Sequence, residues 1–310
     1  REGPTIQIAS SVFSLFHKWL PAGIPRLAAK SYYITGAAAG LAAAFNTPLG
    51  GIVFAIEELA RIHVSFFRTA LFSAVIIAGL TAQSLAGPYL YLGYPDAANI
   101  SKVAFAGVAV TAILTGYFGA GTAHIILRIM EWRSRLTKKQ TVVFTLSVGL
   151  IVAAIAYVAN PQILGSGKEL MNKVLFTADK HTSASTLLMR ILGPVLCFNV
   201  GAAGGIFAPS LAAGAAMGSF IAGIADFAGA NANILILGGM VGFLTGVTRT
   251  PMTSAILVLE MTDRHSVIFY LMLAAMLASM AALLVDEMSF YERLRNKYLE
   301  TLERESSQPA

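Results

Sequence analysis

Several long apolar stretches constrain this chain more than any other feature of its sequence. They include 66–93, 103–130, 141–159 and 266–285. About 20 mainly apolar residues in a helix cross the hydrocarbon core of a bilayer. Charged residues make up only 12% of the chain, against roughly 25% in an average soluble protein. Because lipid offers the backbone no hydrogen bonds, stretches of this length predict an all-α polytopic membrane protein.

Other apolar segments are too short, or too broken by glycine and proline, to cross a bilayer alone. The most irregular is GAAGGIFAPSLAAG at 201–214, which contains four glycines and one proline. Irregular backbone inside a membrane protein is tolerated where it is buried in protein or lines a cavity. We therefore expect broken and tilted helices among the full spans.

Positive charge gathers in two places, and the chain carries a net charge of +6. One cluster comprises Arg128, Arg133, Arg135, Lys138 and Lys139, and the other Arg293, Arg295 and Lys297. This pattern is typical of cytoplasmic loops and of contacts with lipid headgroups, so we expect both clusters on the cytoplasmic side and no nucleic-acid partner. The single cysteine, Cys197, excludes an intrachain disulfide and is predicted to be a buried structural thiol.

Two segments far apart in the sequence resemble each other. Residues 36–59 and 239–262 each contain a Thr-Pro pair, followed by a glutamate at the same distance. An offset of 203 residues places Thr47 on Thr250 and Glu57 on Glu260. Such internal duplication is common in transporters, often with inverted topology, and we expect an inverted repeat here.

A proline near the start of a predicted helix also recurs, at Pro4 and at Pro209. We therefore divide the chain into three parts. These are the remainder of a first inverted repeat at 1–98, a second inverted repeat at 99–286 and a C-terminal cytoplasmic helix at 287–310. The second copy has far more residues before its proline than the first, and the repeat predicts that about 100 N-terminal residues are missing.

Helices opened by proline suggest anion binding. The first N–H groups of a helix have no intrahelical acceptor, and the helix dipole adds partial positive charge there. Away from water an anion can satisfy them. The candidates are the backbone groups of Gly3, Gly205, Ile206 and Phe207. The alternative is a kinked helix whose glycines allow close packing, but two such motifs at matched places favour ion binding.

Glutamates stand next to these helices. Glu2 precedes the first proline, Glu57 and Glu58 follow IVFAI, and Glu260 follows ILVL. Acidic groups within a membrane usually face a cavity or a partner, and a carboxyl group in apolar surroundings can take up a proton near neutral pH. The alternative for Glu57 and Glu58 is a solvated helix end, with Arg61 pairing one of them. For Glu260 we expect a structural role.

Tyr291 follows the last apolar span, where its hydroxyl could donate to an anion or serve as an interfacial aromatic. Arg249 is predicted to be a loop or ion-pair residue. The sequence contains no G-x-S-G nucleophile motif and no H-E-x-x-H motif, and its five histidines are scattered. We therefore expect neither an enzyme active site nor a metal site.

Several of these motifs together resemble the CLC family of chloride channels and proton-coupled chloride transporters. REGPT at 1–5 is similar to the end of that family's G-[KR]-E-G-P motif, and GIFAP at 205–209 matches its G-x-F-x-P motif. AAAFNTPLGGIVFAIEEL and PMTSAILVLEMTD also match in order and spacing. The resemblance extends from residue 1 to about 295, and implies a short, prokaryote-like member with CLC-type inverted repeats.

The resemblance implies roles for individual residues. Glu2 would be the gate and proton acceptor, Glu58 with Glu57 beside it would transfer protons internally, and Tyr291 would coordinate the anion. Gly3, Gly205, Ile206 and Phe207 would contribute to anion binding through the backbone. No other cofactor than bound chloride ions is implied.

The resemblance also implies a function. A glutamate at position 58 suggests a chloride/proton antiporter, in a multi-pass homodimer of the bacterial inner membrane. The alternative is a passive voltage- or pH-gated chloride channel of the same fold.

Overall fold

The computed structural model describes residues 2–16, 19–20, 27–60, 67–87, 90–201 and 204–306, without the side chains of Glu2 and of 301–306. Within these ranges the chain is helical, with no strand. The α-helices are α1 (Glu2–Phe16), α2 (Ala29–Phe45), α3 (Pro48–Phe54), α4 (Arg68–Ala86), α5 (Lys102–Ser134), α6 (Lys138–Val158), α7 (Lys168–Phe176), α8 (Ala184–Phe198), α9 (Phe207–Ile224), α10 (Gly229–Thr248), α11 (Pro251–Thr262), α12 (Ile268–Leu283) and α13 (Phe290–Ser306). A π-helical segment, η2 (Ala55–Ala60), continues α3.

Six helices in the described part of the chain are long and apolar enough to cross a membrane: α4, α5, α6, α9, α10 and the segment that ends with α12. Others, such as α3 and α11, are shorter and begin at a proline. This mixture of full spans and short helices confirms the expected polytopic all-α fold with broken helices. The protein is an integral, multi-pass membrane protein.

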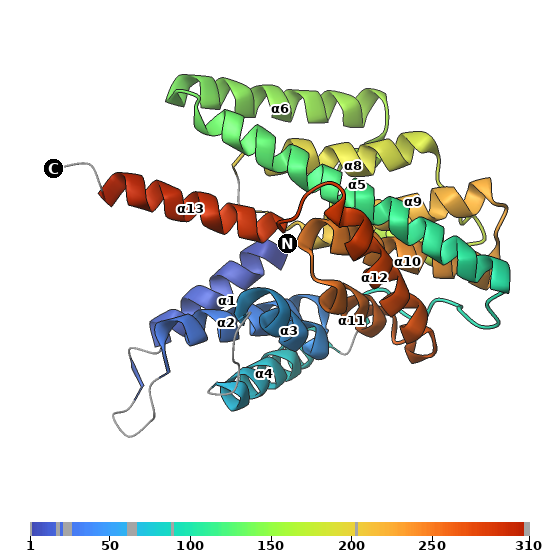
Figure 1. Ribbon diagram of the computed structural model, residues 1–310, viewed down its shortest axis with the longest axis horizontal. Helices are drawn as coiled ribbons and strands as arrows, with labels where there is room; N and C mark the ends of the chain where they lie inside the picture. Colours follow the sequence, from blue (N-terminus) through green and yellow to red (C-terminus); the bar gives the residue numbers. More distant parts are fainter. Residues whose placement is uncertain are drawn as a thin grey trace.

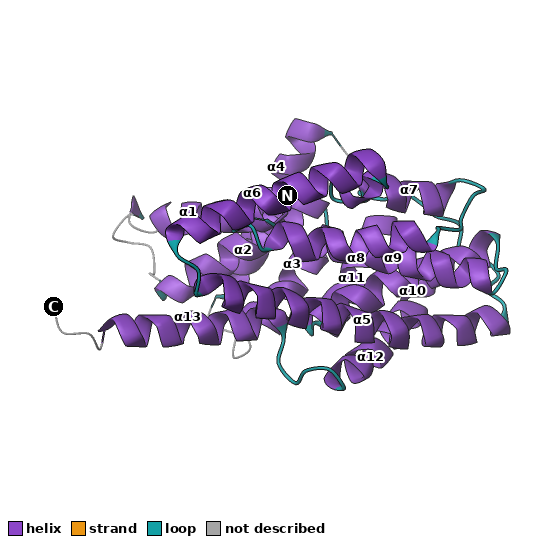
Figure 2. Ribbon diagram, turned by 90° about the horizontal axis from the view of Figure 1, so that it is seen from above, coloured by secondary structure: helices purple, strands orange, loops and turns teal. Residues whose placement is uncertain are grey.

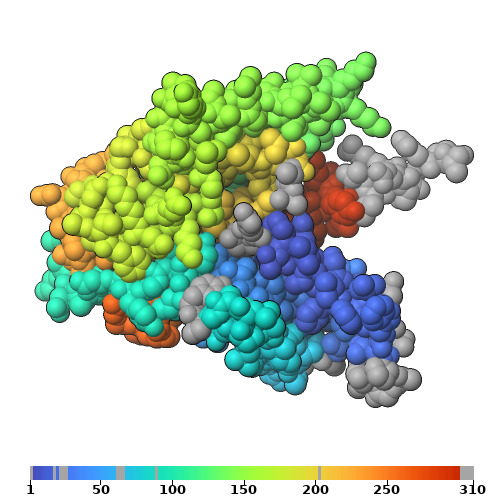
Figure 3. Space-filling model, turned by 180° about the vertical axis from the view of Figure 1, so that it is seen from behind, coloured from blue at the N-terminus to red at the C-terminus, as the bar shows by residue number. Residues whose placement is uncertain are grey.

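The helices form two groups. In Figure 1, α1 to α4 lie together on one side, α5, α6, α8 to α10 and α12 lie on the other, and α11 lies between them. Figure 3, from behind, shows the same division between the blue-to-cyan part and the green-to-orange part. The predicted boundaries at 98 and 286 fall in the connections between α4 and α5 and between α12 and α13. The division into repeat halves stays a prediction.

The predicted repeat is visible in the backbone. α2 ends at Phe45 and α10 ends at Thr248, and each is followed by a residue in the left-handed conformation, Asn46 and Arg249. Thr47 then has φ −128° and ψ 79°, and Thr250 has φ −118° and ψ 77°. The same turn, at the same offset of 203 residues in the sequence, supports the duplication.

The core lies where α9 crosses α10. A Cβ on Gly214 of α9 would lie 2.2 Å from the carbonyl oxygen of Gly239 of α10, and one on Gly239 would lie 2.4 Å from the carbonyl oxygen of Gly214. The two backbones therefore touch, as small residues permit in membrane proteins. This close crossing explains why α9 carries so many glycines and alanines.

Both positive clusters lie around one groove. A cavity of about 800 Å³ between α5 and α13 is lined by Arg128 and Arg135 of the first cluster and by Arg293 and Lys297 of the second. This agrees with their expected position on one side of the membrane. The prediction for Cys197 is wrong: it is exposed rather than buried, because the surface of α8 that packs against its neighbours carries Gly193 and Val195 instead.

Candidate functional site

The first turn of α1 meets the segment that leads into α9. The start of the chain lies near the middle of the view in Figure 1, and in Figure 2, from above, it lies on the side away from α12. A Cβ on Gly3 would lie 2.3 Å from the carbonyl oxygen of Gly204 and 3.0 Å from Cα of Gly205. Only glycine allows the first turn of α1 to approach the segment before α9 so closely. The structure thus brings the two motifs that the sequence singled out, 2–4 and 205–209, to one place.

The start of α9 has no side-chain cap. Ile206 is its N-cap residue, and its side chain cannot accept a hydrogen bond from the backbone. The first N–H groups of the helix therefore depend on an acceptor other than a capping side chain. Ile206 and Phe207 are buried, with 3% and 1% of their surface exposed. Pro209 is the third helical residue of α9, as Pro4 is of α1, so the matched prolines predicted from the sequence occupy equivalent positions.

Aromatic rings surround this helix start. The ring of Phe207 lies 5.4 Å from that of Phe54 at the end of α3, edge to face, and 6.4 Å from that of Tyr291 in the first turn of α13. Phe290 lies 5.6 Å from Tyr291. The sequence singled out Phe207 and Tyr291, but gave no signal for Phe54. Together these rings bring α3, α9 and α13 around a single apolar site, a setting that strengthens electrostatic interactions.

Glu58 is one of few buried acids. It lies in η2, the π-helical continuation of α3, and only 9% of its surface is exposed. Short π-helical segments are rare and frequently occur at functional sites. Its burial favours an acid inside the protein over a solvated helix end, and its role in proton transfer stays a prediction. The side chain of Glu2 and all of Arg61 lie outside the described residues.

The side chain of Glu57 binds the start of α11. Its carboxylate accepts hydrogen bonds from the backbone N–H groups of Met252 and Thr253, at 3.1 and 2.7 Å, and from the hydroxyl of Thr253 at 2.7 Å. Those groups belong to the first turn of α11. Glu260 accepts from the N–H groups of Leu49 and Gly50 in α3, at 3.0 and 2.7 Å. The structural role expected for Glu260 is therefore confirmed.

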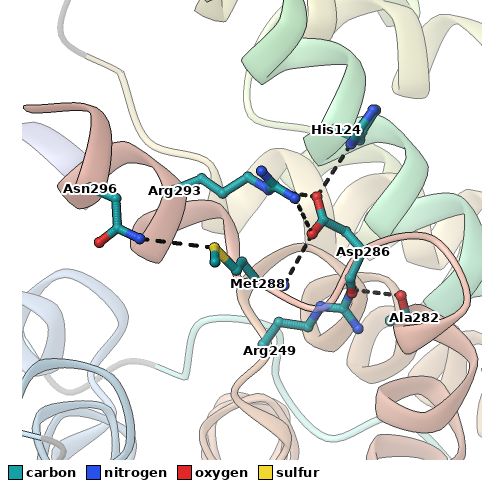
Figure 4. A network of polar contacts seen from close by, with 7 residues as sticks. All are labelled: His124, Arg249, Ala282, Asp286, Met288, Arg293 and Asn296. Carbon is teal, nitrogen blue, oxygen red and sulfur yellow. Dashed lines mark hydrogen bonds and ion pairs between the residues drawn. The ribbon is translucent and has the colours of Figure 1, made fainter. Parts of the chain in front are cut away.

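A polar network anchors the helix that carries Tyr291 (Figure 4). Asp286, whose side chain is 7% exposed, accepts from Arg293 of α13, from the N–H of Met288 and lies 3.3 Å from Nδ1 of His124. Burial alone would raise the pKa of Asp286, but the hydrogen bonds from Arg293, Met288 and His124 outweigh it and lower that pKa to about 2. The sequence analysis did not predict this network. An acid and an arginine seven residues apart, Asp286 and Arg293, were the feature of the sequence that could have indicated it.

Arg249 joins the same network from α10. It ends that helix in the left-handed conformation, and its guanidinium donates to the carbonyl oxygens of Ala282 and Asp286. It is thus a loop residue, as predicted, and it holds the end of α12 through carbonyl groups. Among the described residues, no group of three or more His, Cys, Asp or Glu side chains could hold a metal ion.

Comparison with known proteins gives a family and several relatives. The family model described as voltage gated chloride channel matches residues 1–283. A protein of Klebsiella pneumoniae named H(+)/Cl(-) exchange transporter ClcA is 29% identical over 327 residues, which cover 100% of this chain and 67% of the relative. The protein of that name from Citrobacter koseri is 32% identical over 301 residues, which cover 91% of this chain and 61% of the relative. The chain spans about three fifths to two thirds of these relatives.

Solved structures share the fold. The crystal structure of a slow cyanobacterial Cl-/H+ antiporter has a TM-score of 0.81 and 25% identity, over 96% of this chain and 71% of that one. A CLC-type fluoride/proton antiporter has a TM-score of 0.76 over 90% of this chain and 69% of that one, and its 17% identity shows likeness of fold alone. Since the family model matches almost all of the sequence, the chain belongs to the CLC family.

Proposed function

We propose that the protein is a chloride/proton antiporter of the bacterial inner membrane. The observation that carries this proposal is Glu58, a carboxyl group 9% exposed in the π-helical continuation of α3. A passive chloride channel needs no buried acid, whereas exchange needs a group that can take up and release a proton. The names of the ClcA relatives and of the cyanobacterial structure support the same activity.

The anion would bind where the starts of α1 and α9 meet. The backbone at Gly3, Gly205, Ile206 and Phe207 would supply N–H groups and space, with the hydroxyl of Tyr291 as a further donor. Support comes from the contact of Gly3 with Gly204 and from the ring of Tyr291 beside Phe207. Chloride ions would be the only bound group that the mechanism needs.

The proton would use two acids. Glu2, at the first residue of α1, would occupy an anion position when charged and leave it on protonation. Glu58 would pass protons between Glu2 and the cytoplasmic side. The carboxylate of Glu57 instead binds the first turn of α11. A homodimer, with one such pathway in each subunit, also stays a prediction.

The test uses the natural full-length protein in liposomes with a chloride gradient and no proton gradient. Chloride efflux and external pH are recorded together, before and after valinomycin is added to carry compensating charge. Uphill proton movement in step with chloride is expected, and Glu58→Gln should abolish the proton movement while some chloride movement remains.

Chloride flux without proton movement in the unmodified protein would favour the passive channel instead. Uphill proton pumping by Glu58→Gln would leave antiport intact but would remove Glu58 from the proton path.

A further inference from the structure

Glu57 and Glu260 each cap the helix of the other. Oε1 and Oε2 of Glu57 accept from Met252 and Thr253 at 3.1 and 2.7 Å, and the same atoms of Glu260 accept from Leu49 and Gly50 at 3.0 and 2.7 Å. Every member of one set is related to its counterpart by the offset of 203 residues in the sequence. Contacts that are exchanged in this way require a two-fold relationship, because each copy must present the same two surfaces to the other.

These bonds replace caps that the helices lack. Thr47 and Thr250 are the N-cap residues of α3 and α11, and neither gives its own helix a side-chain cap hydrogen bond. Without these bonds, the orphan N–H groups of each first turn would lack a side-chain acceptor. Hydrogen bonds to a charged acceptor are stronger than those to a neutral one. The two glutamates therefore form a reciprocal clamp between α3 and α11.

The two glutamates of the clamp are equivalent in the repeat, but the residues that follow them in the sequence differ. The offset that relates Glu57 to Glu260 relates Glu58 to Met261, which is fully buried. The first copy is π-helical over Ala55–Ala60, whereas α11 is α-helical over Pro251–Thr262. Both copies thus keep the clamping acid, and only the first copy combines it with a second acid and a π-helical turn.

We propose that Glu57 is a positioning residue: the clamp with Glu260 fixes the π-helical turn so that Glu58 is held in its buried orientation. This inference rests on the proposed antiport. Both carboxylate oxygens of Glu57 already accept hydrogen bonds, one of them from two donors. Protonation would remove the negative charge that strengthens the bonds from the N–H groups of Met252 and Thr253, so proton uptake would weaken the clamp. Glu57 therefore acts through Glu58 and does not carry the proton.

The experiment compares two substitutions in the natural full-length protein, Glu57→Gln and Glu260→Gln, in the liposome assay. Each replaces a carboxylate by an amide of the same size, with one oxygen instead of two to accept the N–H groups. The readout is the number of protons moved per chloride. We expect both variants to keep chloride turnover and to lower this ratio alike, by about two- to tenfold, because each loses part of one charge-assisted cap.

Glu260→Gln is the discriminating variant, because Glu260 contacts the first turn of α3, at Leu49 and Gly50, and not the turn that carries Glu58. Loss of all proton movement in Glu57→Gln, with a normal ratio in Glu260→Gln, would make Glu57 a proton carrier and overturn the proposal. An equal fall in chloride and proton flux in both variants would mean that the clamp only maintains the fold. Unchanged ratios in both would remove the clamp from the mechanism.

Two controls complete the test. Glu131→Gln, in an exposed ion pair with Arg135, should leave the ratio unchanged. Thr253→Val removes only the hydroxyl bond to Glu57 and should give a smaller fall in the ratio. It tests the proposal if Glu57→Gln does not fold, and a normal ratio in Thr253→Val would then count against it. Chloride flux without protons in the unmodified protein would instead refute antiport itself.

Discussion

The carboxylate of Asp286 accepts hydrogen bonds from both Nε and Nη2 of Arg293, at 2.6 and 2.5 Å. This bidentate pair ties the connection after α12 to the first turn of α13, the turn that also contains Tyr291. The position of the proposed anion donor therefore depends on an ion pair outside the membrane spans. His124 of α5 contacts the same carboxylate, and Arg249 of α10 donates to the backbone carbonyl oxygen of Asp286. Asp286 therefore links the end of α12 to α5, α10 and α13.

Asp286→Asn is expected to lower the free energy of unfolding by about 2 kcal/mol, because it weakens hydrogen bonds between charged groups at a buried site. Thermal unfolding of the purified protein in detergent measures the change. Glu131→Gln is the matched control, because Glu131 and its partner Arg135 are exposed, and breaking an exposed pair costs about 0–1 kcal/mol. Equal losses in the two variants would show that Asp286 is not an anchor.

The same residue predicts a dependence of stability on pH. The pKa of Asp286 is lowered in the folded protein from 3.8 to about 2, so the folded state favours its charged form. Its contribution is complete above about pH 4 and is lost as the pH falls towards 2, with a size of about 2 kcal/mol. Thermal unfolding between pH 5 and 2 should therefore show a steeper loss of stability in the unmodified protein than in Asp286→Asn. Parallel curves would contradict the prediction.

Much of this architecture could be predicted from the sequence. The offset of 203 residues between the two Thr-Pro pairs predicted equivalent turns, and the backbone angles at Thr47 and Thr250 agree. What the offset could not predict is that Glu57 and Glu260 cap each other's helices. A repeat in sequence gives the correspondence of residues but not which surfaces of the two copies meet.

Other features depend on packing that a single sequence does not contain. The π-helical turn at Ala55–Ala60 has no signature in composition, and Phe54 is one of many apolar residues until Phe207 is found beside it. Cys197 was wrongly predicted to be buried because an apolar segment in a membrane protein has two kinds of apolar surface. One packs against other helices and the other is exposed, and hydrophobicity alone does not distinguish them.

The crossing of α9 and α10 predicts strong sensitivity to a single methyl group. Gly214→Ala would bring its Cβ to 2.2 Å from the carbonyl oxygen of Gly239, so the helices must separate. We expect a loss of about 1–3 kcal/mol, the usual cost of overpacking a core, measured by thermal unfolding. Gly121→Ala in α5 is the control, because nothing lies within 4 Å of its added Cβ. It should be neutral or stabilising, by up to about 1 kcal/mol. Equal stabilities of Gly214→Ala and Gly121→Ala would contradict the close contact between α9 and α10.

Tyr291 offers the most direct test of the anion site. Tyr291→Phe keeps the ring, which lies 6.4 Å from Phe207 and 5.6 Å from Phe290, and removes only the hydroxyl. If that hydroxyl donates to chloride, its loss should weaken chloride binding about tenfold or more, since hydrogen bonds to charged groups contribute about 1.5–3 kcal/mol. Isothermal titration of chloride into the purified full-length protein measures this change.

The matched control for that titration is Tyr298→Phe on the same helix, whose side chain is 66% exposed and which should bind chloride as the unmodified protein does. Thermal unfolding should change little in either variant, because both keep their rings. Unchanged chloride affinity in Tyr291→Phe would mean that the hydroxyl of Tyr291 does not donate to chloride. The backbone groups at Gly205, Ile206 and Phe207 would then be left as the proposed anion donors, because their N–H groups need an acceptor whether or not a phenol is present.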